Sequence, residues 1–363
     1  MTTTREDLPP EERLLGLARG VLPPDDAAAE EARRRHLRLT KPPGSLGDLE
    51  ELGARLAGMA GACPPPVPER PAVLLAAGDH GVLARGVSPW PREVTSGMVR
   101  NFCRGGAAVN ALAATVGARV LVLDVGVAGG TEPHPLLRHA RVRPGTADLS
   151  RGAAMGREEA ARAALAGAEA AGSLISGGAD LLVTGDMGIG NTTPAACLVT
   201  AFTGRPAAEV TGRGTGIDDE TLALKVRVVE EALTLHNPNP ADPLGVLAAV
   251  GGLEHAALAG AILSSASRRV PVVLDGVSSC ASALVAATLS PPSAGYMIAG
   301  HLSAEPGSAA ALKLLGLDPL LDLRMRLGEG TGGLLAVPLV QAASRVLSEM
   351  ATFEEAGIGG GEG

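Results

Sequence analysis

The chain has 363 residues and a net charge of −8, with 31 basic and 39 acidic residues spread along its length, so it offers no basic stripe for a nucleic-acid partner. No apolar run approaches the ~20 residues of a membrane span, and residues 1–12 lack the apolar core of a signal peptide. Four isolated cysteines without metal-ligand spacing argue against a zinc site and a disulfide framework, so we expect a soluble, cytoplasmic protein: Cys63, Cys103, Cys197 and Cys280.

Two helical segments open the chain, at about residues 10–39 and 45–60. The helix-breaking sequence KPPG at residues 41–44 separates them. The second helix starts at Ser45, with Asp48 three residues later, which is the spacing of a capping box.

Four short apolar runs follow, and each ends in an aspartate: residues 73–79, 120–124, 181–186 and 270–275. Their hydrophobicity is continuous rather than alternating, which indicates burial on both faces, as in a parallel sheet. Alanine-rich helical stretches lie between the runs, at residues 157–172, 219–235 and 246–266. This alternation predicts an α/β fold with a doubly wound parallel sheet.

Residues 305–352 are again mostly helical, and Pro338 is expected to kink or break a helix there. We therefore predict a large α/β domain at residues 61–304. The two chain ends, residues 1–60 and 305–363, would pack together as a smaller helical domain. Gly359–Gly363 are expected to form a frayed tail.

The third strand runs into a glycine-rich segment, GDMGIGNTT at residues 185–193. Its glycines would let backbone N–H groups approach a ligand, and Thr192 or Thr193 can cap a helix that accepts Pro194 in its first turn. A helix N-terminus behind such a loop favours an anion, such as a phosphate. An ordinary glycine turn that feeds a helix is the alternative.

A second glycine-rich loop, GRGTG at residues 212–216, leads into a helix capped by Asp218 or Asp219. Lys225 lies two turns into that helix. Taken by itself, a lysine at such a position is usually a solvated surface residue.

Three further residues each have a functional and a structural interpretation. Trp90, in the rigid sequence SPWP at residues 88–91, either stacks on a flat ring or seals the core. His80 and His301 are more often hydrogen-bonded structural groups than catalysts at such positions. We therefore assign neither histidine a catalytic role.

Glu329 stands between glycines in the sequence GEGTG at residues 328–332, just before an apolar helix from about Leu334. Tightly turned backbone would hold its carboxylate at a fixed place. It is a candidate catalytic carboxylate, and a structural role in accepting local N–H bonds is the alternative.

Six motifs in order make the chain resemble the nicotinate-nucleotide:dimethylbenzimidazole phosphoribosyltransferases, over nearly its whole length. The motifs are KPPGSLG at residues 41–47, DHG at 79–81 with VSPWP at 87–91, GIGNTT at 188–193, GRGTG at 212–216, HLSAE at 301–305 and RLGEGTG at 326–332. The resemblance implies a homodimer of Rossmann-like subunits that needs no metal or other cofactor. It implies transfer of phosphoribose, with inversion, from nicotinate mononucleotide to a benzimidazole nitrogen, a step of cobalamin lower-ligand synthesis.

By resemblance, Glu329 is the base that accepts the benzimidazole proton, and Asp186 is a second carboxylate that stabilises an oxocarbenium-like transition state. The phosphate would be held by Lys225, Ser303 and the backbone of Gly188, Ile189, Gly190, Asn191 and Thr192. Gly214 would also bind the substrate. The aromatic base would lie against another set: Ser88, Trp90 and Met187.

Two positions depart from the family pattern. Many members carry glutamate where this chain has Asp186, and a glutamine that can reach the base is expected where it has Gly97. An acceptor other than dimethylbenzimidazole, such as adenine or a phenol, is therefore an alternative. A nucleotide-binding protein without turnover is the alternative from a different functional class.

Overall fold

The computed structural model describes residues 8–214 and 216–358. Six strands form one parallel sheet in the order β3-β2-β1-β4-β5-β6. Their bounds are β1 Pro71–Gly78, β2 Arg119–Gly126, β3 Leu137–His139, β4 Leu181–Met187, β5 Val272–Leu274 and β6 Met297–Ala299. The predicted α/β fold with a doubly wound parallel sheet is confirmed.

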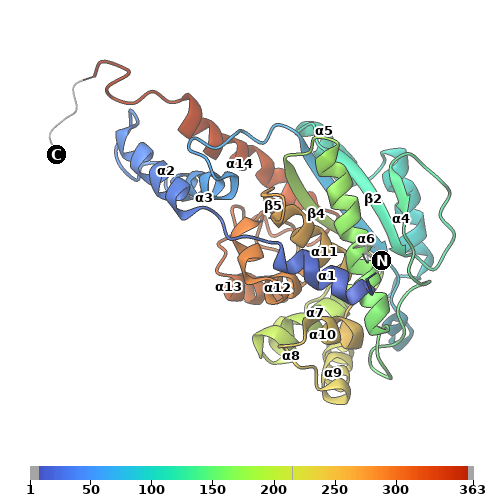
Figure 1. The fold of residues 1–363 in the computed structure, drawn as a ribbon. Helices are drawn as coiled ribbons and strands as arrows, with labels where there is room; N and C mark the ends of the chain where they lie inside the picture. Colours follow the sequence, from blue (N-terminus) through green and yellow to red (C-terminus); the bar gives the residue numbers. More distant parts are fainter. Residues whose placement is uncertain (1–7, 215, 359–363) are drawn as a thin grey trace.

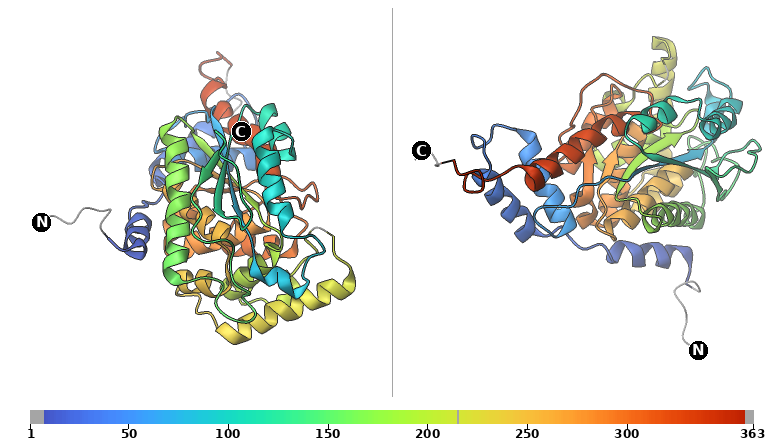
Figure 2. Two further views of the ribbon diagram at one scale, coloured as in Figure 1. Left: turned by 90° about the vertical axis from the view of Figure 1, so that its right-hand side faces the viewer. Right: turned by 90° about the horizontal axis from the view of Figure 1, so that it is seen from above.

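Helices cover both faces of the sheet (Figures 1 and 2). Helix α6 (Arg157–Ser176) lies on one face with α11 (Leu253–Ala266) packed against it, whereas α4 (Glu93–Arg104) and α5 (Ala108–Thr115) lie on the other. Every residue of β1 is buried, as continuous hydrophobicity predicts for a central strand between two helical layers. The remaining helices lie around this core: α7 Thr192–Thr203, α8 Ala207–Val210, α9 Asp219–His236, α10 Pro243–Val250 and α12 Val277–Leu289.

Two predicted helices are each two helices in the structure. Residues 10–39 form α1 (Pro10–Arg19) and α2 (Asp26–Arg38), because Pro23 and Pro24 lie between them. Residues 246–266 are divided between α10 and α11, whose boundary is the pair Gly251–Gly252. Glycine pairs cost backbone entropy in a helix, and here they end one helix and start the next.

The predicted capping box at Ser45 is wrong. Helix α3 (Asp48–Ala60) begins after Gly47, which has φ 55° and no side-chain cap. The Glu50 carboxylate accepts the N–H of Leu46 (3.1 Å) and the Nζ of Lys41 (2.6 Å) instead. The Glu50 carboxylate of α3, paired with Lys41 of the preceding KPPG segment, thus takes the place of the serine cap.

The C-terminal region contains helix α13 (Pro306–Leu315), an irregular segment over residues 316–330 and helix α14 (Thr331–Glu349). Pro338 lies inside α14 and does not break it. The irregular segment ends in the Glu329 turn, so α14 begins two residues after Glu329 rather than near Leu334.

The chain ends contribute to two packing regions. Helices α2 and α3 pack together and against α14, and an antiparallel bridge joins Leu39 to Thr352 (Figure 1). Helix α1 packs on α6, and α13 packs on α12 and α7. The division into domains at residues 61–304 stays a prediction, and the expected tail at Gly359–Gly363 lies outside the described residues.

Candidate active site

The carboxyl ends of the four strands predicted from sequence bring four aspartates to one edge of the sheet, but only one of them faces a pocket. The Asp79 carboxylate accepts the N–H of Ala128 (2.7 Å), which ties two strand ends together. Asp124 accepts the N–H of Val127 (2.9 Å) and pairs with Arg141 (2.9 Å). These two aspartates therefore shape the sheet edge.

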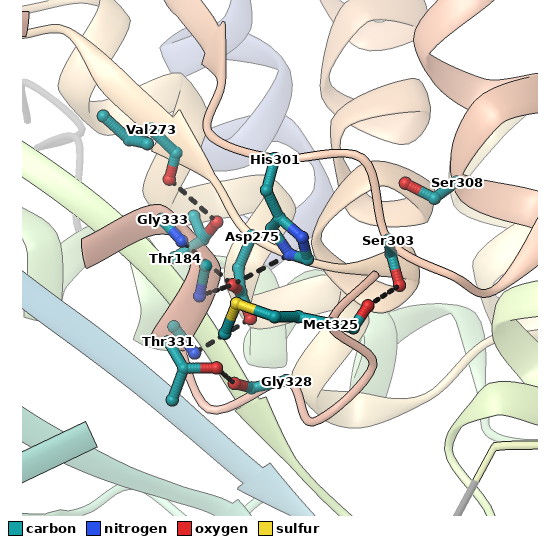
Figure 3. A network of polar contacts seen from close by, with 12 residues as sticks. Thr184, Val273, Asp275, His301, Ser303, Ser308, Met325, Gly328, Thr331 and Gly333 are labelled. Atoms are coloured by element: carbon teal, nitrogen blue, oxygen red, sulfur yellow. Dashed lines mark hydrogen bonds and ion pairs between the residues drawn. The ribbon is translucent and has the colours of Figure 1, made fainter. Parts of the chain in front are cut away.

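Asp275 binds the start of α14 (Figure 3). Its Oδ2 accepts the N–H of Gly330 (3.0 Å), and its Oδ1 accepts those of Gly332 (2.7 Å) and Gly333 (3.0 Å). His301 Nε2 lies 3.4 Å from the same Oδ1. The Asp275 carboxylate thus anchors the N-terminus of α14, the helix that follows Glu329.

The remaining aspartate, Asp186, lines an open pocket beyond the ends of the strands. This location is the usual ligand site of an open parallel sheet. The pocket brings together ten of the thirteen residues expected in the site: Ser88, Asp186, Gly188, Ile189, Gly190, Asn191, Thr192, Gly214, Lys225 and Ser303.

The first glycine-rich loop forms one wall of this pocket. Gly190 has φ 89°, and a side chain on Gly188 would lie 2.2 Å from the carbonyl oxygen of Gly78, so both positions require glycine. Asn191, rather than Thr192 or Thr193, precedes α7, and it makes no side-chain cap. The N–H of Ile189 donates to the Thr95 hydroxyl (3.1 Å). That bond fixes the loop to α4.

Lys225 is a buried pocket residue, not a surface lysine. Its Nζ donates to the Thr192 hydroxyl (2.7 Å) and to the carbonyl oxygen of Gly212 (2.9 Å), which joins the two glycine-rich loops. Burial lowers the pKa of the lysine to about 8, although Glu305 opposes the shift. As predicted, Asp218 caps α9, the helix that carries Lys225, by accepting the N–H of Thr221 (2.8 Å).

Glu305 and Arg326 also line the pocket. Both lie in motifs of the family resemblance, but neither was predicted to be a site residue. Glu305 accepts the N–H of Gly214 (2.7 Å), and Arg326 donates to the Gly214 carbonyl (2.6 Å). Ser303 donates to the carbonyl of Met325 (3.3 Å), beside them. The second loop is therefore fixed from two sides. The charged residues of the HLSAE and RLGEGTG motifs were the sequence feature that could have identified these two site residues.

The Asp186 carboxylate accepts the side-chain amide of Asn191 at 2.5 Å. Burial, and after it the charge of Asp275, raises the pKa of Asp186 to about 6. The group therefore stays an anion at neutral pH inside a low-dielectric pocket.

Glu329 lies in the turn that crosses the end of β4. It has φ 61°, and Gly328 and Gly330 on either side have φ 83° and 80°. A left-handed conformation costs a non-glycine residue roughly 1–2 kcal/mol, so the surroundings must stabilise this turn. Its side chain is outside the pocket lining, although the adjacent Gly328 is part of it.

The carboxylate of Glu329 is poorly solvated. The residue is 5% exposed, and its Oε2 is buried without a hydrogen-bond partner. Burial, then the charges of Asp186 and Asp275, raise its pKa to about 7. A carboxylate with a pKa near neutrality and one oxygen without a partner can accept a proton from a bound molecule.

Behind Asp186 lies a fully buried ionic cluster. Glu254 Oε1 is 2.9 Å from His80 Nε2 and 2.8 Å from His255 Nδ1. Burial alone would lower the pKa of His80, but the Glu254 carboxylate outweighs it and raises the pKa. His80 and His301 thus both pair with buried carboxylates, as expected of structural histidines.

Two expected base-binding residues lie outside the pocket lining. Trp90 is 50% exposed, so it does not seal the core. Met187 is the last residue of β4 and is half buried, next to Asp186 in sequence. Ser88 does line the pocket, and its hydroxyl accepts the N–H of Trp90 (3.3 Å).

Two absences can be stated for residues 8–214 and 216–358. No group of three or more His, Cys, Asp or Glu side chains there could hold a metal ion. Within the same part of the chain, no helix is long and apolar enough to cross a membrane.

Known proteins resemble this chain over almost its full length. A family model described as "Phosphoribosyltransferase" matches residues 21–358. The nicotinate-nucleotide–dimethylbenzimidazole phosphoribosyltransferase of Salinispora tropica is 56% identical over 350 residues, covering 93% of this chain and 96% of the relative. The protein of that name from Chloroflexus aggregans is 58% identical over 336 residues, covering 93% and 95%.

A solved structure agrees with these relatives. The crystal structure of the enzyme of that name from Thermus thermophilus has a TM-score of 0.89 and 50% identity, covering 93% of this chain and all of that chain. Sequence identity, fold and the position of the pocket all support the same family. This chain is therefore a member of the nicotinate-nucleotide–dimethylbenzimidazole phosphoribosyltransferase family.

Proposed function

We propose that the pocket binds nicotinate mononucleotide and that the chain transfers its 5-phosphoribose to a nitrogen of 5,6-dimethylbenzimidazole. The products are α-ribazole 5′-phosphate and nicotinate. The names of the relatives state this donor and acceptor for those proteins. In this chain the observation that carries the proposal is the buried carboxylate of Glu329, whose Oε2 has no hydrogen-bond partner and whose pKa is raised to about 7, beside the pocket.

The phosphate end of the donor is assigned to the two glycine-rich loops. Lys225 is the buried cation between them, and Ser303 supplies a hydroxyl that lines the same pocket. A bound phosphate would replace lost water around the ammonium, which favours the charged lysine. The start of α7 adds the partial positive charge of a helix N-terminus.

Glu329 is assigned as the general base. When one nitrogen of the benzimidazole attacks the anomeric carbon, the N–H at its other nitrogen must lose a proton, and the Glu329 carboxylate accepts it. The departing nicotinate nitrogen is cationic in the donor, so it leaves without a general acid. Positioned proton transfer of this kind contributes about 10²–10⁴ to the rate.

Asp186 is assigned to the ribose. Cleavage of the bond to nicotinate gives the anomeric carbon oxocarbenium character, as in glycoside hydrolysis, and a nearby carboxylate stabilises that charge. Its contact with Asn191 fixes the carboxylate at the pocket wall. With a pKa of about 6 it is ionised at neutral pH, as this role requires.

Product identification tests the function. Nicotinate mononucleotide is incubated with dimethylbenzimidazole, and the products are separated by chromatography with mass detection. Formation of α-ribazole 5′-phosphate and an equal amount of nicotinate is expected. Tight donor binding without product from any azole or phenol would overturn the transferase and favour the binding protein without turnover.

A panel with adenine and phenols decides the acceptor. A side chain on Gly97 of α4 would meet only the end of Arg100, at 3.8 Å, so the space that a family glutamine would fill is open. A higher kcat/KM with adenine than with dimethylbenzimidazole would replace the acceptor in this proposal and leave the donor chemistry unchanged.

Two broader expectations accompany the proposal. The homodimer implied by the resemblance stays a prediction, and light scattering on a sizing column measures it. The cytoplasmic location also stays a prediction, and fractionation of cells that express the protein addresses it.

A further inference from the structure

Asp275 has both of its carboxylate oxygens occupied by the chain itself. It is 1% exposed and accepts three backbone N–H groups, of Gly330, Gly332 and Gly333, at 2.7–3.0 Å. These groups belong to the start of α14, where N–H groups have no partner within the helix. Asp275 therefore satisfies the helix start from a different element, the end of β5, and does not line the pocket.

The residues that Asp275 holds come directly after Glu329. Gly330 is its chain neighbour, and the Thr331 hydroxyl donates to the Gly328 carbonyl at 2.7 Å, which closes the turn (Figure 3). The backbone of Glu329 in that turn has a strained left-handed φ of 61°. An attachment on its C-terminal side is needed to keep this conformation.

His301 supports the same attachment. Its ring lies 3.4 Å from Asp275 Oδ1, and a side chain on Gly332 would meet that ring at 2.0 Å. The first turn of α14 can therefore approach Asp275 only because residue 332 is glycine. The aspartate, the histidine and the glycine form one interlocked support.

We propose that Asp275 is a positioning residue for catalysis, which holds Glu329 over the end of β4 through the first turn of α14 and places a second negative charge near the Glu329 carboxylate. This inference rests on the proposed role of Glu329 as the base. Loss of Asp275 should therefore change kcat and the pH dependence of kcat, and it should leave donor binding unchanged.

The charges around Glu329 determine the expected pH effect. Burial contributes most to its raised pKa, and the charges of Asp186 and Asp275 add to it. Helix α5 and the first turn of α14 carry no titratable side chain. The other titratable groups facing this region are His301 after β6 and the buried cluster behind Asp186: Glu254, His80 and His255.

The main experiment compares pH profiles of kcat for the full-length protein and Asp275→Asn. The amide keeps one acceptor oxygen but places an NH₂ group against backbone N–H donors, so kcat should fall about 10- to 100-fold from misplacement of the turn. Loss of the charge should move the acid limb of kcat to lower pH by about half a unit or more. The KM for nicotinate mononucleotide should stay within about threefold.

Asp180→Asn is the matched control, because Asp180 lies just before the opposite end of β4 and binds the N–H of Arg70 (2.7 Å). It should leave kcat and the pH profile unchanged. A kcat and acid limb for Asp275→Asn that match this control would overturn the inference, as would a rise in the donor KM that accounts for the whole loss of activity.

Thr331→Val keeps the inference testable if Asp275→Asn does not fold. It removes the hydroxyl bond to the Gly328 carbonyl, keeps the backbone N–H bond of residue 331 to the same oxygen (3.1 Å) and changes no charge, so kcat should fall several-fold while the acid limb stays in place. A kcat within about twofold of the unmodified protein would overturn the positioning role. Failure of the unmodified protein to make product would instead defeat the proposed function, and a fully active Glu329→Gln would defeat the base assignment.

Discussion

Gly185 lies directly beneath Glu329. A side chain built on Gly185 would come within 2.8 Å of the Glu329 carbonyl carbon and 2.9 Å of the Gly330 nitrogen. The backbone of β4 thus supports the strained loop by direct contact, and no larger residue fits between them. The strand that carries Asp186 and the loop that carries Glu329 are thereby held in one fixed arrangement.

Replacement of Gly185 by alanine should displace the Glu329 turn. We expect kcat to fall about 100-fold, because a shift near 1 Å at a catalytic group costs that much. Steady-state kinetics measure it, and thermal unfolding checks that the fold remains. Gly152→Ala is the control, since a side chain there meets nothing within 4 Å. Equal activity of the two variants would contradict the supporting role of Gly185.

Replacement of Lys225 by methionine should weaken donor binding. The KM for nicotinate mononucleotide is expected to rise about 10- to 100-fold, because hydrogen bonds to charged groups contribute about 1.5–3 kcal/mol. Lys313→Met, which removes an exposed lysine from α13, should leave KM unchanged. A loss of kcat at constant KM would place Lys225 in the chemical step rather than in phosphate binding.

The pH profile should differ between kcat/KM and kcat. In the free enzyme Glu329 must be ionised, with a pKa of about 7, and Lys225 must be protonated, with a pKa of about 8. The kcat/KM profile should therefore be a narrow bell between these values. Bound phosphate keeps the lysine charged, so kcat should show the acid limb alone. An activity that stays constant down to about pH 5 would contradict a base with a raised pKa.

The stability of the protein should also report the raised pKa of Glu329. An acid whose pKa is raised from 4.5 to about 7 on folding destabilises the folded state as pH rises through this interval. Glu329→Gln should therefore increase the free energy of unfolding at about pH 8 by on the order of 1 kcal/mol, and the gain should vanish near about pH 4. Urea unfolding measures it, with the exposed Glu354→Gln as the control. An equal effect at both pH values would contradict this linkage.

Much of the fold follows from local sequence patterns. The four apolar runs ending in aspartate are β1, β2, β4 and β5, because burial on both faces demands continuous hydrophobicity. Strand β3 contains one apolar residue, and strand β6 is followed by glycine rather than aspartate, so neither fits this pattern. The helix breaks at Pro23–Pro24 and Gly251–Gly252 follow from backbone restrictions that the hydrophobic pattern does not reveal.

The pocket residues that belong to short contiguous motifs could be predicted from the sequence. The glycine-rich loops bring their residues to one pocket, whereas the position of Lys225 in its helix predicted a surface residue and only the family resemblance placed it in the site. The role of Asp275 depends on contacts with residues 55–58 positions away, which no local pattern encodes. The same is true of the Glu254 cluster with His80, whose partners come from α11 and the end of β1.

The kinetics of Glu329→Gln test the proposed general-base mechanism most directly. Single-turnover formation of α-ribazole 5′-phosphate should slow by about 10²–10⁴, because only proton acceptance is lost. Calorimetric binding of nicotinate mononucleotide should stay within about threefold of the unmodified protein. A turnover within a few-fold of the unmodified enzyme would contradict Glu329 as the base.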